Sequence, residues 1–158
     1  MLLAIKQFFE DKLSVNAEQA AQQNDKKIEL ASAALMFELM RTDARIDERE
    51  KQALTLVLSE TFKLGKDSLE ELLRMAETAA TEATSLFEFT SLINESYSYD
   101  QRVQLVENLW KVAFADLKLD RYEEHMIRNV SDLIYVRHSD FIRTKLKVKE
   151  ALSGSSEE

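Results

Sequence analysis

No proline interrupts this chain of 158 residues, and only two glycines occur in it, Gly65 and Gly154. Turns between strands depend heavily on these two residue types, so the sequence offers little support for a β-sheet. Several Asp or Ser residues are instead followed three positions later by Glu or Gln, the spacing of a capping box at a helix N-terminus. The sequence therefore predicts an all-α protein, a compact bundle of about seven to eight helices.

The pattern of apolar residues and caps divides the chain into eight predicted helices. Capping boxes are expected to begin at Asp47, Asp67, Ser85, Ser98 and Asp120, and Gly65 is expected at the C′ position of a helix. The predicted helices lie near residues 2–14, 25–42, 47–63, 68–81, 86–95, 99–115, 120–134 and 140–152.

Three segments are expected along the chain. Residues 1–24 read as an N-terminal amphipathic helix and a polar linker, residues 25–152 as the helical domain, and residues 153–158 as a disordered tail. The charged face of the first helix mixes acids with lysines, whereas a membrane-surface helix would carry a basic face. We therefore expect this helix, with Phe8 and Phe9, to pack against the domain or a protein partner.

An acidic phrase occurs twice in the chain, 73 residues apart. The first copy is Asp43-x-x-Ile46-Asp47-x-x-Glu50 and the second is Asp116-x-x-Leu119-Asp120-x-x-Glu123. Each copy follows a segment that is apolar on nearly every side, residues 28–40 and residues 103–115, which is typical of a buried central helix. The repeat predicts two pseudo-two-fold helix-loop-helix units built around these two helices.

Helix capping explains part of this phrase. Asp47 and Asp120 suit the N-cap position, while Glu50 and Glu123 suit the third helical position of a capping box. The first aspartate of each copy is different, because it lies at the end of an apolar helix and faces the negative pole of the helix dipole. A bound cation would stabilise that arrangement and would also reduce repulsion between the two loops.

All the candidate ligands are hard oxygen donors, which favours Ca²⁺, Mg²⁺ or Mn²⁺ over Zn²⁺. The spacing is not that of an EF-hand, since Arg45, Glu48 and Leu54 stand at positions 3, 6 and 12 of the loop. The sequence thus leaves two interpretations open, helix caps alone or one divalent-metal site. The predicted metal ligands are Asp43, Asp47, Glu50, Asp116, Asp120 and Glu123.

Composition excludes several other classes of function. The formal charge is −8, which disfavours nucleic-acid binding. No apolar run approaches the roughly 20 residues that span a bilayer, so no membrane insertion is expected. The absence of cysteine is compatible with a cytoplasmic protein. The chain contains neither a Gly-rich phosphate loop nor a Gly-x-Ser-x-Gly motif, so the sequence gives no indication of an enzyme.

One basic cluster near the end is expected to be a solvated helix face: Arg137, Arg143, Lys145, Lys147 and Lys149.

The repeated phrase, set among apolar helices, resembles the TerB-like family of tellurite-resistance-associated domains. The resemblance covers roughly residues 28–146 and includes Leu109-Trp110-Lys-Val-Ala-Phe-Ala-Asp116 and His138-Ser-Asp-Phe-Ile142. It implies a compact all-helical domain with an acidic cluster for a divalent metal, found in stress and metal-response systems and in a DnaJ-type co-chaperone. Many members carry glycine where this chain has Ala44 and Leu117, so we expect that the loops here either are tighter or extend the helices by a residue.

We therefore expect a non-catalytic TerB-like binding module whose acidic cluster holds a divalent cation. The alternative is a protein-interaction or co-chaperone-type scaffold in which the carboxylates are caps and solvated charge. The identity of the metal, the protein partner and the oligomeric state are not specified by the sequence.

Overall fold

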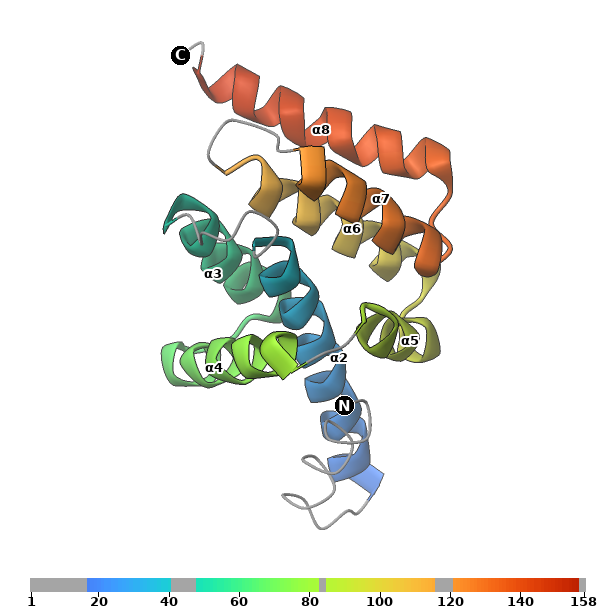
Figure 1. The fold of residues 1–158 in the computed structure, drawn as a ribbon. Helices are drawn as coiled ribbons and strands as arrows, with labels where there is room; N and C mark the ends of the chain where they lie inside the picture. Colours follow the sequence, from blue (N-terminus) through green and yellow to red (C-terminus); the bar gives the residue numbers. More distant parts are fainter. Residues whose placement is uncertain (1–16, 41–47, 83–84, 116–120, 157–158) are drawn as a thin grey trace.

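A computed structural model describes the backbone of residues 17–40, 48–82, 85–115 and 121–156, and the side chains of residues 27–40, 48–82, 85–115 and 121–152. This part of the chain forms helices and no strand, so the all-α prediction is confirmed (Figure 1). None of the described helices combines the length and apolar character needed to cross a membrane. The predicted helix at 2–14 lies outside the described residues.

The described helices are α2 (Ala17–Met40), α3 (Glu48–Phe62), α4 (Lys66–Glu82), α5 (Phe87–Ser96), α6 (Tyr99–Ala113), α7 (Arg121–Leu133) and α8 (His138–Ser156).

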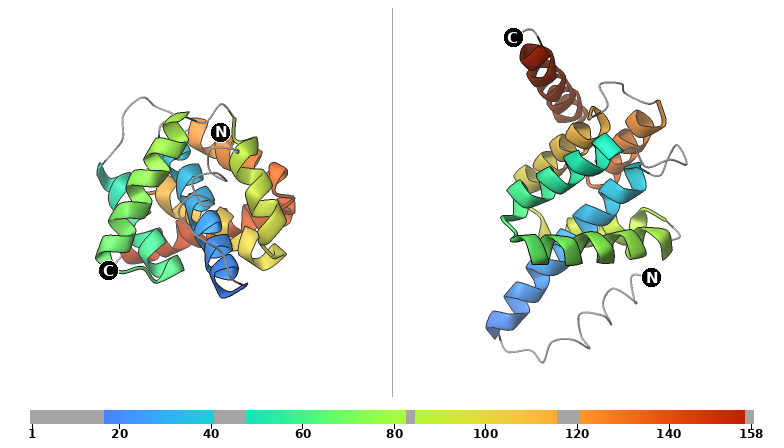
Figure 2. Two further views of the ribbon diagram at one scale, coloured as in Figure 1. Left: turned by 90° about the horizontal axis from the view of Figure 1, so that it is seen from below. Right: turned by 90° about the vertical axis from the view of Figure 1, so that its left-hand side faces the viewer.

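Helices α2 and α6 form the centre of the bundle. α2 contacts α3, α4, α5, α6 and α7, and α6 also contacts α3, α7 and α8. Residues 30–37 of α2 and residues 105–110 of α6 are all buried, which confirms that the two apolar segments are the central helices. α4 and α5 flank α2, while α8 lies along α6 and α7 and its C-terminal end projects beyond them (Figures 1 and 2).

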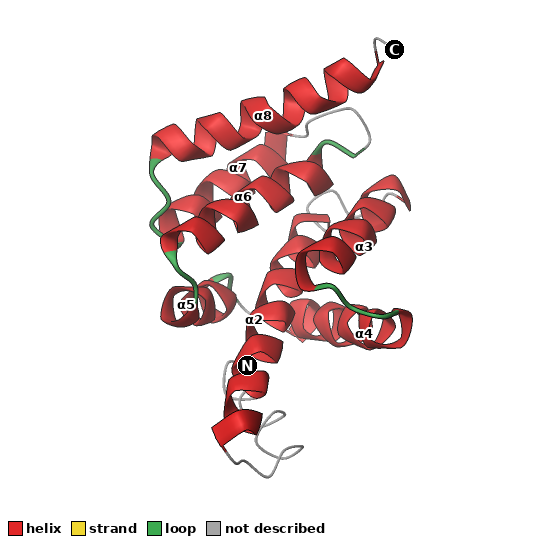
Figure 3. Ribbon diagram, turned by 180° about the vertical axis from the view of Figure 1, so that it is seen from behind, coloured by secondary structure: helices red, strands yellow, loops and turns green. Residues whose placement is uncertain are grey.

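The helix boundaries repeat with the sequence. α2 ends at Met40 and α6 at Ala113, while α3 begins at Glu48 and α7 at Arg121, so both boundaries recur after 73 residues. α3 packs on α6, and α7 packs on α2. The second helix of each unit therefore contacts the first helix of the other unit. The ends of α2 and α6 and the starts of α3 and α7 lie toward the same end of the molecule (Figure 3). The helix pairs of the two predicted units are therefore present, and the two pairs pack against each other.

Two of the described helices, α2 and α8, extend further than their predicted bounds. α2 begins at Ala17, within the segment expected to be a linker, because residues 17–24 are mostly Ala, Gln and Glu, which favour helix. α8 continues to Ser156, within the segment expected to be disordered. No proline stops it, and sequence patterns locate helix ends poorly.

The predicted helix caps are confirmed only in part. Ser98 and Gln101 form the expected capping box at the start of α6, with bonds of 2.8 and 3.3 Å. The expected box at Ser85 is absent, because Leu86 is the N-cap of α5 and makes no side-chain cap. Lys63, and not Gly65, takes the left-handed conformation after α3, with φ of 53°. The residue in the left-handed conformation therefore lies two positions before Gly65, where it was predicted.

Candidate functional site

Two of the six predicted metal ligands lie in the described part of the chain. These are Glu50 on α3 and Glu123 on α7, the third residue of each helix. The other four, Asp43, Asp47, Asp116 and Asp120, lie outside the described residues. The structure therefore places one residue from each copy of the acidic phrase.

Glu50 and Glu123 are both turned into the protein, with exposed fractions of 1% and 2%. The two residues that precede each of them, Glu48 with Arg49 and Arg121 with Tyr122, are exposed. Each helix therefore buries only the glutamate among its first three residues. The same pattern in both units means that the repeat conserves the orientation of this side chain as well as its spacing.

Burial of an ionised carboxylate costs a large desolvation free energy. Moving an ionised carboxyl group out of water is costly unless hydrogen bonds, an opposite charge or a metal ion compensate. Glu50 and Glu123 each take part in interactions, and the third helical position suits the return bond of a capping box. Such a bond to the backbone does not in itself require burial, because capping boxes form readily at the surface.

The described part of the chain contains no complete group of metal-ligating side chains. Among the described residues, no set of three or more His, Asp or Glu side chains is placed to hold a metal ion.

The comparison with family models gives a match to the family described as tellurite resistance protein TerB, over residues 29–146. The chain belongs to the TerB family. The match includes both units of the repeat and ends within α8. No curated protein and no solved structure is significantly similar to the chain.

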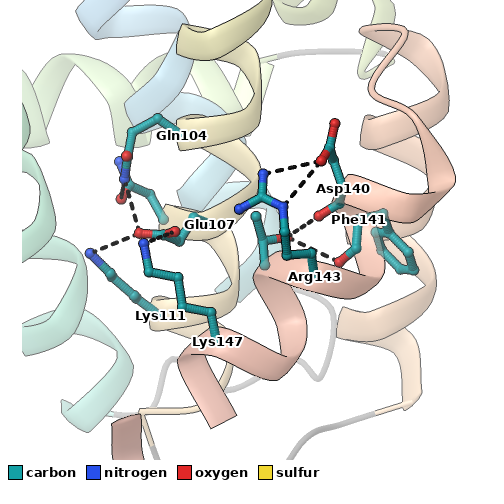
Figure 4. A network of polar contacts seen from close by, with 9 residues as sticks. Gln104, Glu107, Lys111, Asp140, Phe141, Arg143 and Lys147 are labelled. Atoms are coloured by element: carbon teal, nitrogen blue, oxygen red, sulfur yellow. Dashed lines mark hydrogen bonds and ion pairs between the residues drawn. The ribbon is translucent and has the colours of Figure 1, made fainter. Parts of the chain in front are cut away.

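The TerB domain contains a second polar cluster, which the sequence analysis did not identify. Glu107, near the middle of α6, accepts a hydrogen bond from Lys147 Nζ on α8 at 2.9 Å and from Gln104 Nε2 at 3.3 Å (Figure 4). Lys111 Nζ lies 3.6 Å from the same carboxylate. Burial raises the pKa of Glu107, but Lys147, Gln104 and Lys111 together lower it more, so the pKa lies below its ordinary value.

The basic cluster is largely solvated, as expected, since Arg137, Arg143, Lys147 and Lys149 are exposed and only Lys145 is half-buried. Two of its lysines also pair with residues of other helices. Lys147 pairs with Glu107 of α6, and Lys145 Nζ lies 2.7 Å from Glu124 Oε1 of α7. Arg143 pairs within α8 with Asp140 at 3.1 Å. The alternation of basic residues at 143, 145 and 147 gave no sign of partners on other helices, since those partners are distant in sequence.

A third polar contact fixes the start of α8. Tyr99 donates to Asp140 Oδ2 at 2.5 Å and accepts from the backbone N–H of Arg137 at 3.0 Å. The Tyr99 hydrogen bond, followed by contacts with Arg143, lowers the pKa of Asp140. Desolvation and the same hydrogen bond raise the pKa of Tyr99. This part of the TerB domain therefore serves to dock α8, and no substrate or metal is required to explain it.

Proposed function

We propose that this TerB domain is a non-catalytic binding module that holds a divalent cation between its two repeat loops. The ligands would be Asp43, Asp47 and Glu50 from the first unit and Asp116, Asp120 and Glu123 from the second. The observation that carries the proposal is the burial of Glu50 and Glu123 at equivalent positions. A shared cation would offset the desolvation of both carboxylates at once.

Two further features support this proposal. The helix ends that carry the loops lie toward the same end of the molecule, which allows both loops to contribute to one site. The donors are carboxylate oxygens, which suit Ca²⁺, Mg²⁺ or Mn²⁺. The family description associates the fold with tellurite resistance, and we extend to this chain a role in metal or stress response in the cytoplasm.

One set of surface residues favours a second function, that of a protein-interaction scaffold. Tyr122 on α7, Tyr135 after α7 and Phe87 on α5 are large and exposed, with fractions of 71%, 73% and 64%. Tyrosines with a solvent-facing ring are frequent anchors of protein interfaces. The N-terminal residues Phe8 and Phe9, also predicted to serve such a function, lie outside the described residues.

The test is thermal and urea unfolding of the chain in EDTA and then with Ca²⁺, Mg²⁺ or Mn²⁺ at fixed ionic strength. A site at about 100 times its Kd should add roughly 2.7 kcal/mol to the free energy of unfolding and raise Tm by several degrees. A scaffold without metal predicts no response to any of the three ions.

The double variant Glu50→Gln, Glu123→Gln separates metal binding from capping. Glutamine also serves at the third position of a capping box, so the helix starts remain capped while the ligand charges are lost. We expect the metal-free fold to persist and the cation response to disappear. The matched control is Glu60→Gln with Glu77→Gln, two exposed acids on α3 and α4, which should leave the response intact. A full cation response in the first double variant would overturn the proposal.

A further inference from the structure

A pocket of about 400 Å³ lies between α2, the end of α3 and α6. Its apolar part is formed by buried side chains of the two central helices, Ile28 and Met36 on α2 and Leu105 on α6. Phe62 and Tyr97, both half-buried, add aromatic rings to the lining. The volume falls in the range of small-molecule sites, and this lining suits a ligand with a flat apolar body.

Three carboxamides of α6 line one side of this pocket, Gln101, Gln104 and Asn108. Their spacings of three and four residues place them on one face of the helix, about 4.5 and 6 Å apart along its axis. Gln104 Nε2 donates to Asn108 Oδ1 at 3.1 Å and to Glu107 Oε2 at 3.3 Å. Asn108 Nδ2 in turn donates to Thr61 Oγ1 at 3.0 Å. These bonds fix the orientations of the Gln104 and Asn108 amide planes.

The network leaves both a donor and an acceptor for a ligand. Both amide protons of Gln104 are used, so its Oε1 remains as an acceptor, whereas Asn108 Nδ2 keeps one proton to donate. Gln101 Oε1 accepts from the backbone N–H of Ser98, so Gln101 offers its own amide protons. This side of the pocket therefore presents a donor, an acceptor and a donor in order along α6. A carboxamide complements an acceptor beside a donor, because it carries an N–H and a C=O in one plane.

The lining also favours a neutral ligand over a charged one. Among the described residues that line the pocket, none is Lys or Arg, so an anion would lose its hydration without a counterion. Glu29 is the one carboxylate of the described lining, and it already takes part in another interaction. A cationic group carries donors only, so it would leave the remaining proton of Asn108, a residue 3% exposed, without an acceptor. A neutral group with both functions avoids these costs.

We propose that this pocket binds a small neutral molecule in which a carboxamide is attached to an apolar ring. The amide N–H would donate to Gln104 Oε1, and the amide oxygen would accept from Asn108 Nδ2. The ring would lie on Met36 and Leu105, beside Phe62. A site that pairs both halves of an amide discriminates against analogues that lack one half, because a buried polar group is then left unpaired. The pocket shares no residue with the proposed metal site, so each can be tested without the other.

The test compares four probes that share one ring and nearly one shape: benzamide, acetophenone, benzoate and benzamidinium. Each is titrated into the full chain at neutral pH and followed by the ε-methyl NMR resonances of the methionines. Benzamide should shift the resonance of Met36, which lines the pocket, and leave that of Met126 on α7 unchanged. We expect benzamide to bind about fivefold or more tightly than each of the others, since each lacks one of the paired groups or carries a charge.

Gln104→Met tests the acceptor, because methionine keeps the length of the side chain and removes its oxygen. The variant should bind benzamide about fivefold more weakly and acetophenone with much less change, since acetophenone has no N–H to donate. The matched control is Gln52→Met, on an exposed residue of α3 outside the pocket, and it should change neither affinity.

Four results would each overturn the proposal. Three are read on the unaltered chain and do not depend on the folding of a variant: equal affinities for benzamide and acetophenone, tighter binding of benzoate or benzamidinium, and an unmoved Met36 resonance. The fourth is an unchanged benzamide affinity in Gln104→Met.

Discussion

Lys147 on α8 places its ammonium nitrogen 2.9 Å from a carboxylate oxygen of Glu107, a residue near the middle of the central helix α6. The two partners differ in environment, since the lysine side chain is 63% exposed and the glutamate side chain 10%. The contact therefore joins a solvated charge to a mostly buried one, and it connects the last helix to the core.

Replacing Lys147 by Met should destabilise the protein by about 1 kcal/mol. The exposure of the lysine keeps the value near that of surface pairs, and Lys111 and Gln104 continue to compensate Glu107. Urea unfolding measures the change, with Lys149→Met as the control on an exposed lysine of the same helix. An equal loss in both variants would show that the ion pair makes no specific contribution.

Stability should fall in acid in a window set by Glu107 and Asp140. The pKa of each is lower in the folded protein than its ordinary value, 4.5 for Glu107 and 3.8 for Asp140. A lowered pKa gives stability that is present above the ordinary value and is lost as pH falls through the folded-state value. The free energy of unfolding, measured by urea from pH 7 to pH 3, should therefore begin to lose this contribution below about pH 4.5.

Glu107→Gln should flatten that acid decline, because glutamine does not titrate. The matched variant is Glu77→Gln, on an exposed residue of α4, and it should retain the decline of the parent protein. If the two variants show the same pH profile, Glu107 does not contribute to acid sensitivity.

The two halves of the repeat should respond alike to cavities in the core. Met36 and Leu109 occupy equivalent positions 73 residues apart on the central helices, and they are 1% and 0% exposed. Truncation of either to Ala should cost about 2–5 kcal/mol, since buried methylene groups are lost and a cavity is left. Chemical denaturation tests this, and Leu56→Ala, at a residue 58% exposed on α3, should cost much less. A small effect at one of the two core positions would contradict the equivalence.

Ser98→Ala should cost about 1 kcal/mol, because the serine hydroxyl caps the start of α6. Ser85→Ala is the informative comparison, since Ser85 has the same capping-box spacing in sequence and caps no helix. That variant should lie within about 0.5 kcal/mol of the parent. Thermal or urea unfolding of both variants decides between sequence spacing and observed geometry.

The fold was largely predictable because its signals are strong and local. The apolar character of residues 28–40 and 103–115 identified the central helices, and the acidic phrase identified the repeat. Helix ends were less predictable: Ser85 and Ser98 carry the same signal, but only Ser98 has a helix start in the right place. Spacing shows that a cap is available, whereas chain direction at the turn decides whether it forms.

The candidate sites were predictable to different degrees. The spacing predicted Glu50 and Glu123 as ligands or caps, but it did not predict their burial, because a capping glutamate normally faces water. The contact of Lys147 with Glu107 and that of Asn108 with Thr61 join residues 40 and 47 apart in sequence. No local pattern specifies such pairs, since they depend on how α3 and α8 pack on α6.

The cross-packing of α3 on α6 and of α7 on α2 means that neither repeat unit has a complete core of its own. A chain cut between α4 and α5 would give two fragments, each with an unsatisfied apolar face on its central helix. Those faces are complementary to each other, so the fragments should reassociate into one folded heterodimer when mixed. The domain therefore resembles a dimer whose two similar halves are covalently joined. It should unfold as a single cooperative unit.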